Sequence, residues 1–475
     1  MSCGNILSYG GVGDGTTDNT AAFTAAVTAS PCVSFPPGKF RFNSALGYTF
    51  TADLQSLTIR GEGPDQTVLY WPNTVGTALA VTKNQLGQSV HLRDLSMTTG
   101  TFNDDVGFSS VQVRNFSGPI QGGYASNDIT NVTFRADEGY WEENAGSPTT
   151  ISHGWKTGIL LKDSVWNITG VSIYGPTPTG SGGYPVLGAG SGTGIDVETV
   201  NTNILPALFN ITTSNFTWLE NGLLTGAHAQ GFQVAQSNFV GCYIGIKIPS
   251  GATSITQVSV TGSQLNNIHD IDVAFPVAVL TLGNNLFYVP TGGIGINTTA
   301  QSLMTTITGN VFNGPGAGSG IGISLNPNST DIAPPVITGN NFYSIGTGIS
   351  IGANEFGLVT ANNVFTVTTN NVVSTSPYGQ NSVTGSTANM KPMFSIITGV
   401  ANNGSGMTRI TVPTTAGFFN GQMVLAGGTT GTNPGLSAGE NVASSIVVID
   451  STHIDLTNVQ FGGAYTSGGY ITTYP

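Results

Sequence analysis

Residues 337–351 read ITGNNFYSIGTGISI, and shorter versions of this stretch recur along the middle of the chain. Its second part, a Gly-Ile-x-apolar tetrad, appears as GILL at 158, GIDV at 194, GLLT at 222, GIKI at 245, DIDV at 270, GINT at 295, GISL at 322 and GISI at 348. The gaps between copies are 36 residues and then 28, 23, 25, 25, 27 and 26. A period of this kind indicates one structural unit that is repeated.

The first part of the stretch repeats in step with the tetrad, as ITTSNF at 211, VAQSNF at 234, VTGSQL at 260, ITGNVF at 307, ITGNNF at 337 and VTANNV at 359. Apolar residues alternate with variable ones inside the tetrads, which is the period of a β-strand. Each unit is too short for a pair of helices. The repeat therefore predicts an all-β fold, a parallel β-helix whose strands pair with their copies one coil away at about 4.8 Å.

Stacking the coils in this register predicts two columns of side chains. One is an apolar stack inside the helix, formed by Phe216, Phe239, Leu265, Leu286, Phe312, Phe342 and Val364. The other is a ladder of polar side chains that we expect to satisfy backbone groups at a turn, formed by Ser214, Ser237, Ser263, Asn284, Asn310, Asn340 and Asn362.

Composition agrees with short strands joined by tight turns, because 67 of the 475 residues are glycine and only 8% are charged. The net charge of −12 and the pI near 4.6 argue against nucleic acid as a partner, since its phosphates would be repelled. No apolar run approaches the roughly 18 residues of a membrane span, and we see no leader with a charged and then an apolar part. We expect a soluble protein.

The sequence indicates neither a metal nor a cofactor. The three cysteines are scattered, which favours neither a disulfide framework nor a Cys-x-x-Cys metal site, and we expect Cys32 and Cys242 to be buried free thiols. Asp14 and Asp18 lack the spacing and the terminal Glu of an EF-hand loop.

Residues 8–27, SYGGVGDGTTDNTAAFTAAV, form a glycine-rich stretch followed by an alanine-rich one. A phosphate-binding loop is disfavoured because the glycines are too closely spaced and no Lys-Ser/Thr follows. A solenoid exposes the apolar interior of its first coil unless something covers it. We therefore interpret this stretch as a cap of the solenoid, in which Thr17 or Asp18 is the N-cap of a helix with an apolar face formed by Ala21, Ala22, Phe23, Ala25, Ala26 and Val27.

The run YGGVGDGTTDNTAAFTAAV, followed by VSFPPGKFRF, resembles the N-terminal signature of the pectate-lyase-like superfamily as it occurs in bacteriophage tailspikes. The likeness covers about the first 42 residues and departs from the usual signature at Asn19, where a second Asp is common. The resemblance implies a right-handed β-helix, usually a homotrimer, that cleaves a bacterial surface polysaccharide such as capsule or O-antigen. It also implies a place in the virion, on the phage tail, attached to another tail or baseplate protein.

From about Phe394 the tetrads stop, and short strands with glycine turns follow through STHIDL and AYTSGGYI. These segments resemble a small β module of phage tail and tail-fibre proteins, which would serve as a trimer clamp or as a glycan-binding module. The predicted organisation is a cap and first strand over 1–45, a β-helix catalytic domain over 46–390 and the small β module over 391–475.

Membership of a superfamily does not fix the chemistry, so the site has to be argued from charged residues. The aligned tetrads place Asp196 and Glu198 on the same outward face of one strand, about 6.6 Å apart along it. This separation lies in the window of roughly 6.5 to 9.5 Å that inverting glycosidases use. Lys162 lies one coil before Glu198, and Glu220 follows one coil later beside Trp218. We predict a catalytic carboxylate in this group, the alternative being outward charges that serve solubility and an ordinary Lys162–Glu198 ion pair.

The irregular stretch 135–166 is the second candidate. Its possible catalytic acids are Glu138 and Asp163, and its possible sugar-binding residues are Tyr140, Trp141, His153 and Trp155. The alternative is a solvated loop whose Trp side chains pack on the helix or on a neighbouring subunit. Hydrolysis is favoured over β-elimination because the basic residues available are few, namely His153, Lys156, Lys162 and His228. A non-catalytic adhesin that only binds the glycan is the remaining alternative.

Overall fold

The structure is a computed structural model of the chain. It describes residues 3–473 except 102–104, 114–124, 138–150, 164, 179, 188–191, 199–208, 227–228, 230, 253–254, 301, 317, 329–333, 356–357, 362, 367–368, 376–380, 385–393, 416–417, 432–435 and 437–440. The chain divides into two compact units, Met1–Ala388 and Asn389–Pro475.

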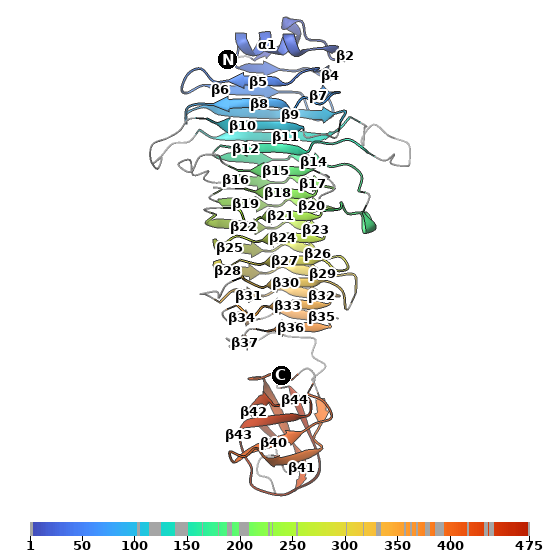
Figure 1. Cartoon of the computed structure of the whole chain (residues 1–475), viewed down its shortest axis with the longest axis vertical. Coiled ribbons are helices and arrows are strands. Elements are labelled where there is room, and N and C mark those ends of the chain that lie inside the picture. Colours follow the sequence, from blue (N-terminus) through green and yellow to red (C-terminus); the bar gives the residue numbers. More distant parts are fainter. Residues whose placement is uncertain are drawn as a thin grey trace. The chain divides into compact units, whose positions relative to one another are not determined.

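The first unit is a parallel β-helix, which confirms the predicted fold (Figure 1). Each complete coil contributes one strand to each of three faces, which we name A, B and C in chain order. Face A contains β1 (Gly4–Asn5), β3 (Cys32–Ser34), β6 (Ser56–Arg60), the first halves of β9 (Ser89–Thr99) and β11 (Asn127–Ala136), β13 (Trp166–Thr169), β16 (Phe209–Thr212), β19 (Gly231–Ala235), β22 (Gln257–Thr261), β25 (Val277–Gly283), β28 (Ser302–Thr308), β31 (Val336–Thr338), β34 (Leu358–Ala361) and β37 (Asn381–Thr384).

Face B follows after a short turn. It contains β2 (Asp14–Asp18), β4 (Gly38–Arg41), β7 (Thr67–Trp71), the second halves of β9 and β11, β14 (Ser172–Tyr174), β17 (Asn215–Thr217), β20 (Asn238–Val240), β23 (Gln264–Asn266), β26 (Leu286–Tyr288), β29 (Val311–Asn313), β32 (Asn341–Tyr343) and β35 (Val364–Thr366). Two short 3-10 helices, η1 and η2, lie outside the ladders at Ile6–Tyr9 and Ser181–Gly183.

Face C carries the Gly-Ile-x-apolar tetrads, each beginning at the second residue of a strand. The glycine leaves room for the aromatic stack, because a Cβ on Gly322 would lie 2.7 Å from the Phe342 ring. The face contains β5 (Leu46–Thr49), β8 (Thr77–Lys83), β10 (Val106–Gln112), β12 (Thr157–Lys162), β15 (Thr193–Val197), β18 (Asn221–Thr225), β21 (Ile244–Ile248), β24 (His269–Val273), β27 (Ile294–Thr298), β30 (Ile321–Leu325), β33 (Thr347–Ile351) and β36 (Asn370–Ser374).

An aromatic stack and an amide ladder run through the interior, as the repeat predicts. The Phe312 and Phe342 rings lie parallel with centroids 4.7 Å apart. At the turn between faces A and B, the backbone N–H of Asn285 donates to Asn310 Oδ1 at 2.9 Å, and that of Asn310 donates to Asn340 Oδ1 at 2.9 Å. The ladder therefore satisfies buried backbone groups, which would otherwise cost stability.

Two coils differ from the predicted register by one residue. Phe287 and Phe365 occupy the inner stack, while Leu286 and Val364 point outward and are exposed. In these two coils the ladder likewise uses the second residue of the Asn-Asn pair, at 285 and 363. The earlier Asn284 takes the left-handed turn position (φ 55°) that glycine holds in neighbouring coils. Asn tolerates this conformation, so the Asn-Asn pairs made the register ambiguous.

The first coil is covered by α1 (Thr20–Ala29), which confirms the capping helix. Phe23 packs against the rings of Phe35 and Phe42, at centroid distances of 6.5 and 6.3 Å. The helix begins later than predicted, because residues 14–18 form strand β2 and Asn19 is the N-cap. Of the six apolar positions expected on the buried face, two are instead exposed, Ala21 and Ala25.

The prediction that Cys32 is a free thiol is wrong, because Cys3 and Cys32 form a disulfide. Strand β1 pairs with β3, which brings the two Cα atoms to 4.6 Å. This pairing involves residues ahead of the recognisable repeat, so cysteine spacing alone did not reveal it. Cys242 is free and buried, as expected.

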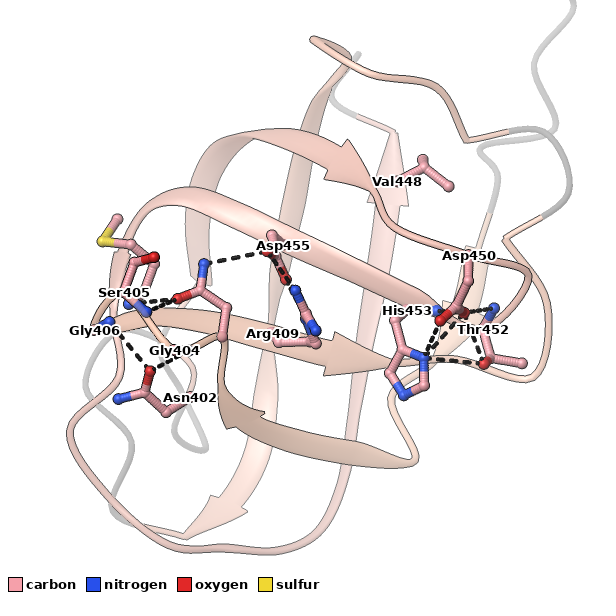
Figure 2. A network of polar contacts seen from close by, with 12 residues as sticks. Asn402, Gly404, Ser405, Gly406, Arg409, Val448, Asp450, Thr452, His453 and Asp455 are labelled. Atoms are coloured by element: carbon pink, nitrogen blue, oxygen red, sulfur yellow. Dashed lines mark hydrogen bonds and ion pairs between the residues drawn. The ribbon is translucent and has the colours of Figure 1, made fainter.

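The second unit is an antiparallel sheet with the strand order β38-β44-β41-β42-β43-β40-β39. Its strands are β38 (Phe394–Ile396), β39 (Gly399–Asn402), β40 (Met407–Thr411), β41 (Met423–Gly431), β42 (Asn441–Val448), β43 (His453–Gln460) and β44 (Tyr465–Thr473). Figure 2 shows the polar groups that fix its turns and one sheet face. Arg409 donates two hydrogen bonds to Asp455, at 2.6 and 2.9 Å, and Asp450 Oδ1 accepts from the N–H groups of Thr452 and His453.

Candidate functional site

Face C places the predicted acids Asp196 and Glu198 on the outside of β15 and just after it. Ile195 and Val197 point into the core, so the alternating pattern of the strand turns Asp196 and Glu198 outward. The register pairs Leu161 with Val197, which puts Lys162 one coil away from Glu198. Their Nζ and Oε1 atoms form an ion pair at 2.5 Å.

Asp196 lies in an apolar position on this outer surface. Its Cα pairs with Leu160 in the preceding coil and with Leu224 in the following one. Burial, assisted by the negative charge of Glu198 and opposed by Lys162, raises the pKa of Asp196 from 3.8 to about 6. Asp196 therefore holds its proton at slightly acidic pH.

Glu198 has a different environment, although it is only two residues away. It is partly exposed and carries its charge in the ion pair with Lys162. On its other side the chain passes very close, because a Cβ on Gly226 would lie 2.7 Å from the Glu198 Cβ. Only a glycine at position 226 leaves the side chain of Glu198 where it is.

The two carboxyls thus have different surroundings within one site, since Asp196 lies at an apolar position and Glu198 is paired with Lys162. The raised pKa suits Asp196 to donating a proton. Their positions on one strand set the separation at about 6.6 Å along the backbone, which leaves room for a water molecule.

The structure separates Glu220 from this pair. Glu220 lies four residues before Leu224, the residue paired with Asp196, so it is about 13 Å away along the strand direction. It precedes β18, at the opposite edge of face C, near Trp218 in the turn from face B. Trp218 is half-buried and has a left-handed backbone conformation (φ 59°).

Two predicted site residues are in the interior. Asp163 is buried and pairs with Lys83 at 2.7 Å, and it also accepts hydrogen bonds from Ser110 and Trp166. Trp155 is 2% exposed, and its Nε1 donates to the carbonyl of Met97. Neither side chain has the surface that contact with a polysaccharide requires, so both are left out of the site. Sequence reasoning placed them on a loop because the coils before residue 190 depart from the later repeat.

The remaining candidates divide between described and undescribed parts of the chain. His153 Nδ1 lies 3.4 Å from Asp137 Oδ1, next to face B and not beside the Asp196 and Glu198 pair. Glu138, Tyr140 and Trp141 lie outside the described residues.

Among the residues that are described, no three His, Cys, Asp or Glu side chains are grouped as a metal site would need. No helix in that part of the chain is long and apolar enough to cross a membrane.

Comparison with known protein families decides the membership of the chain. A family model described as rhamnogalacturonase A/epimerase, pectate lyase-like, matches residues 3–267, which is more than half of the 475 residues. The chain belongs to this family. None of the curated proteins compared matches it in sequence.

Several solved structures match this pectate lyase-like chain at low sequence identity. A tailspike mutant of E. coli bacteriophage HK620, solved with a pentasaccharide, is 10% identical with a TM-score of 0.51, over 99% of this chain and 93% of that one. The catalytic unit of a GH87 α-1,3-glucanase from Streptomyces thermodiastaticus is 13% identical with a TM-score of 0.48, over 81% and 67%. The mannuronan C-5 epimerase AlgE4 A-module of Azotobacter vinelandii is 10% identical with a TM-score of 0.42, over 81% and 99%.

Three residues that surround the two carboxyls in this pectate lyase-like chain were not predicted from the sequence. Leu160, Leu224 and Gly226 shape the surroundings of the two carboxyls, but each belongs to a neighbouring coil. The tetrad register GILL, GIDV, GLLT already aligns the two leucines with Asp196. Because both aligned neighbours of Asp196 are leucines, the aligned tetrads indicate apolar surroundings, which raise the pKa of a carboxyl such as Asp196.

Proposed function

We propose that the protein is a phage tailspike that binds a bacterial surface polysaccharide and depolymerises it by glycosidic hydrolysis. Three observations support this proposal: the pectate lyase-like family match, the fold shared with a tailspike that was solved with a pentasaccharide, and the carboxyl pair on face C. The observation that carries the proposal is the contrast between Asp196, with its raised pKa, and Glu198, with its ion pair.

In this mechanism Asp196 is the general acid and Glu198 the general base. Asp196 gives its proton to the glycosidic oxygen as the bond to the leaving sugar breaks. Glu198 takes a proton from a water molecule that attacks the anomeric carbon from the opposite face. Lys162 holds Glu198 in place through the ion pair to Oε1. The strand spacing predicts inversion at the anomeric carbon.

Other residues have proposed binding roles. Glu220 lies at the far edge of face C, about 13 Å along the strand from Asp196, and would contact a neighbouring sugar unit together with Trp218 in the preceding turn. Glu138, Tyr140 and Trp141, which lie outside the described residues, are proposed as further contacts to the polysaccharide, whereas His153 lies next to face B and is not part of this site. Assembly as a homotrimer, attachment to a tail or baseplate protein, and a place in the virion outside the host cell are further parts of the proposal. The small β module would clamp the trimer or bind glycan.

The test is incubation of the purified protein with capsule and O-antigen polysaccharides from a panel of bacteria. Released reducing ends are followed together with absorbance from unsaturated uronates. Reducing ends without new absorbance support hydrolysis, whereas both together indicate a β-eliminating lyase. Binding without either product indicates an adhesin. Asp272 lies on the same outward column as Asp196, three coils later, so Asp272→Asn is the matched control for Asp196→Asn.

A further inference from the structure

A second polar constellation lies on face A, away from the carboxyls of face C. Strand β9 turns Ser89, His91 and Arg93 outward at every second residue, while Val90 and Leu92 are buried. Asp128, on β11, is the Cα partner of His91 in the next coil. Ser89, His91 and Asp128 therefore meet on one exposed surface although 37 residues separate the last two along the chain.

The contacts among these three side chains run in a definite order. Asp128 Oδ1 contacts His91 Nδ1, and His91 Nε2 lies 3.2 Å from Ser89 Oγ. Arg93 holds the same carboxylate with two hydrogen bonds of 2.7 Å. Burial would raise the pKa of Asp128, but the hydrogen bonds from Arg93 and His91 outweigh it and hold the pKa well below its usual range.

The ionised carboxylate fixes the tautomer of the histidine. A carboxylate can only accept, so His91 Nδ1 must donate to Asp128. In the neutral ring Nε2 is then an acceptor, and Ser89 Oγ is the donor that faces it. This is the connectivity by which a histidine base activates a serine nucleophile in hydrolases of unrelated folds.

The constellation can be reached from solvent. The His91 side chain is 23% exposed and that of Asp128 is 15% exposed, so both are partly accessible at the surface of face A. All three residues stand on paired strands and not on a loop, which keeps their geometry rigid.

We propose that Ser89, His91 and Asp128 form a serine esterase site that removes O-acyl groups, such as O-acetyl, from the polysaccharide. That the acyl group is borne by a polysaccharide rests on the proposed function, whereas the ester hydrolysis itself does not. Ser89 Oγ bonds to the acyl carbonyl carbon while its proton passes to His91 Nε2. The sugar oxygen leaves with that proton, which gives an acyl-Ser89 ester and a free sugar hydroxyl. Water then adds to the ester carbonyl carbon while His91 Nε2 takes one of its protons; His91 passes that proton to Ser89 Oγ as the acyl–oxygen bond breaks, and a carboxylic acid is released.

The backbone limits the speed of this site. The N–H of Ser89 donates to the carbonyl of Gln55 at 3.0 Å, so it is not available to the oxyanion. An oxyanion-hole donor is worth on the order of 10²–10³ in kcat, and we expect turnover to be slow by that measure. Covalent labelling of the serine is therefore a sharper test than turnover alone.

The test treats the full chain with a fluorophosphonate probe and locates the label by peptide mass spectrometry. We expect label at Ser89, with none at that position in Ser89→Ala. Ser56 is the control, because it stands on the same outward column one coil earlier. The Ser56→Ala variant should therefore be labelled at Ser89 to the same extent as the wild type. Asp128→Asn should slow both labelling and p-nitrophenyl acetate hydrolysis by on the order of 100-fold.

The outcomes separate this proposal from the depolymerase. Labelling of Ser89, with acetate released from O-acetylated polysaccharide by the wild type and not by Ser89→Ala, supports the esterase. Absence of label at Ser89, or equal ester hydrolysis by the wild type and Ser89→Ala, overturns it. Depolymerisation by Ser89→Ala at the wild-type rate shows that the variant is folded and that the two activities are independent.

Discussion

Replacing Asp196 by Asn should stabilise the protein in alkaline solution while it abolishes cleavage. The carboxyl is held between Leu160 and Leu224, and its pKa is raised from 3.8 to about 6. A difference of about two pKa units corresponds to about 3 kcal/mol that the folded protein loses when Asp196 ionises. Because the folded pKa is the higher one, this loss is absent below pH 4, grows between pH 4 and 6, and is complete above pH 6. Asn has the same shape and carries no charge, so it avoids the loss.

Thermal unfolding measured at pH 4 and at pH 8 tests this prediction. With an unfolding entropy of about 2.1 cal/mol/K per residue over a unit of 388 residues, 3 kcal/mol raises the Tm of Asp196→Asn by about 4 °C at pH 8. At pH 4 the variant and the wild type should unfold together. Asp272→Asn reports the general effect of removing one negative charge from the same column. An equal shift at both pH values, or a lower Tm at pH 8, would refute the burial argument.

Three further changes test particular contacts. Gly226→Ala places a Cβ 2.7 Å from the Glu198 Cβ, an atom fixed to the backbone, so we expect a loss of kcat together with a loss of stability. Gly251→Ala, whose added Cβ has nothing within 4 Å, should match the wild type in a reducing-end assay. Asp270 is fully buried, which raises its pKa well above the usual range, so the unfolding free energy of the wild type should fall as pH rises above 4. Asp270→Asn should make the unfolding free energy less dependent on pH, and an unchanged pH dependence in denaturant titrations would contradict this. Asn310→Ala breaks the amide ladder and should lower the unfolding free energy by about 3 kcal/mol. Asn341→Ala, at an exposed position in the neighbouring coil, should lower it little. Equal losses in denaturant titrations of the two variants would mean that the ladder is not stabilising.

The fold was predictable from the sequence because its period is written in residues that the coil needs. In five of the eight tetrads the glycine leaves room for a phenylalanine ring, and Asn or Ser side chains at the turns accept hydrogen bonds from the backbone of a neighbouring coil. The prediction erred at Asn284–Asn285 and Asn362–Asn363, where either residue fits the ladder by type. Only the backbone conformation, with Asn284 in the left-handed region, decides between them. The Cys3–Cys32 bridge was missed because it depends on strand pairing before the repeat begins.

The site was predictable in part for the same reason. Lys162, Asp196 and Glu198 fall within the regular repeat, so aligned tetrads placed them together. Asp163 and Trp155 fall in the early coils, where the spacing is longer, and their burial could not be derived from the repeat. The Ser89, His91 and Asp128 constellation joins two strands, β9 and β11, that carry no tetrad. Its only trace in the sequence is the Ser-x-His pair, which is too short to single out.

The most direct test of the central claim is the rate at which Glu198→Gln and Asp196→Asn release reducing ends from a polysaccharide that the wild type cleaves. The account predicts that each variant loses at least on the order of 100-fold in kcat while it still binds the polymer, and that Asp272→Asn keeps the wild-type rate. Wild-type release by Glu198→Gln and Asp196→Asn would contradict the account and place the chemistry elsewhere on the β-helix.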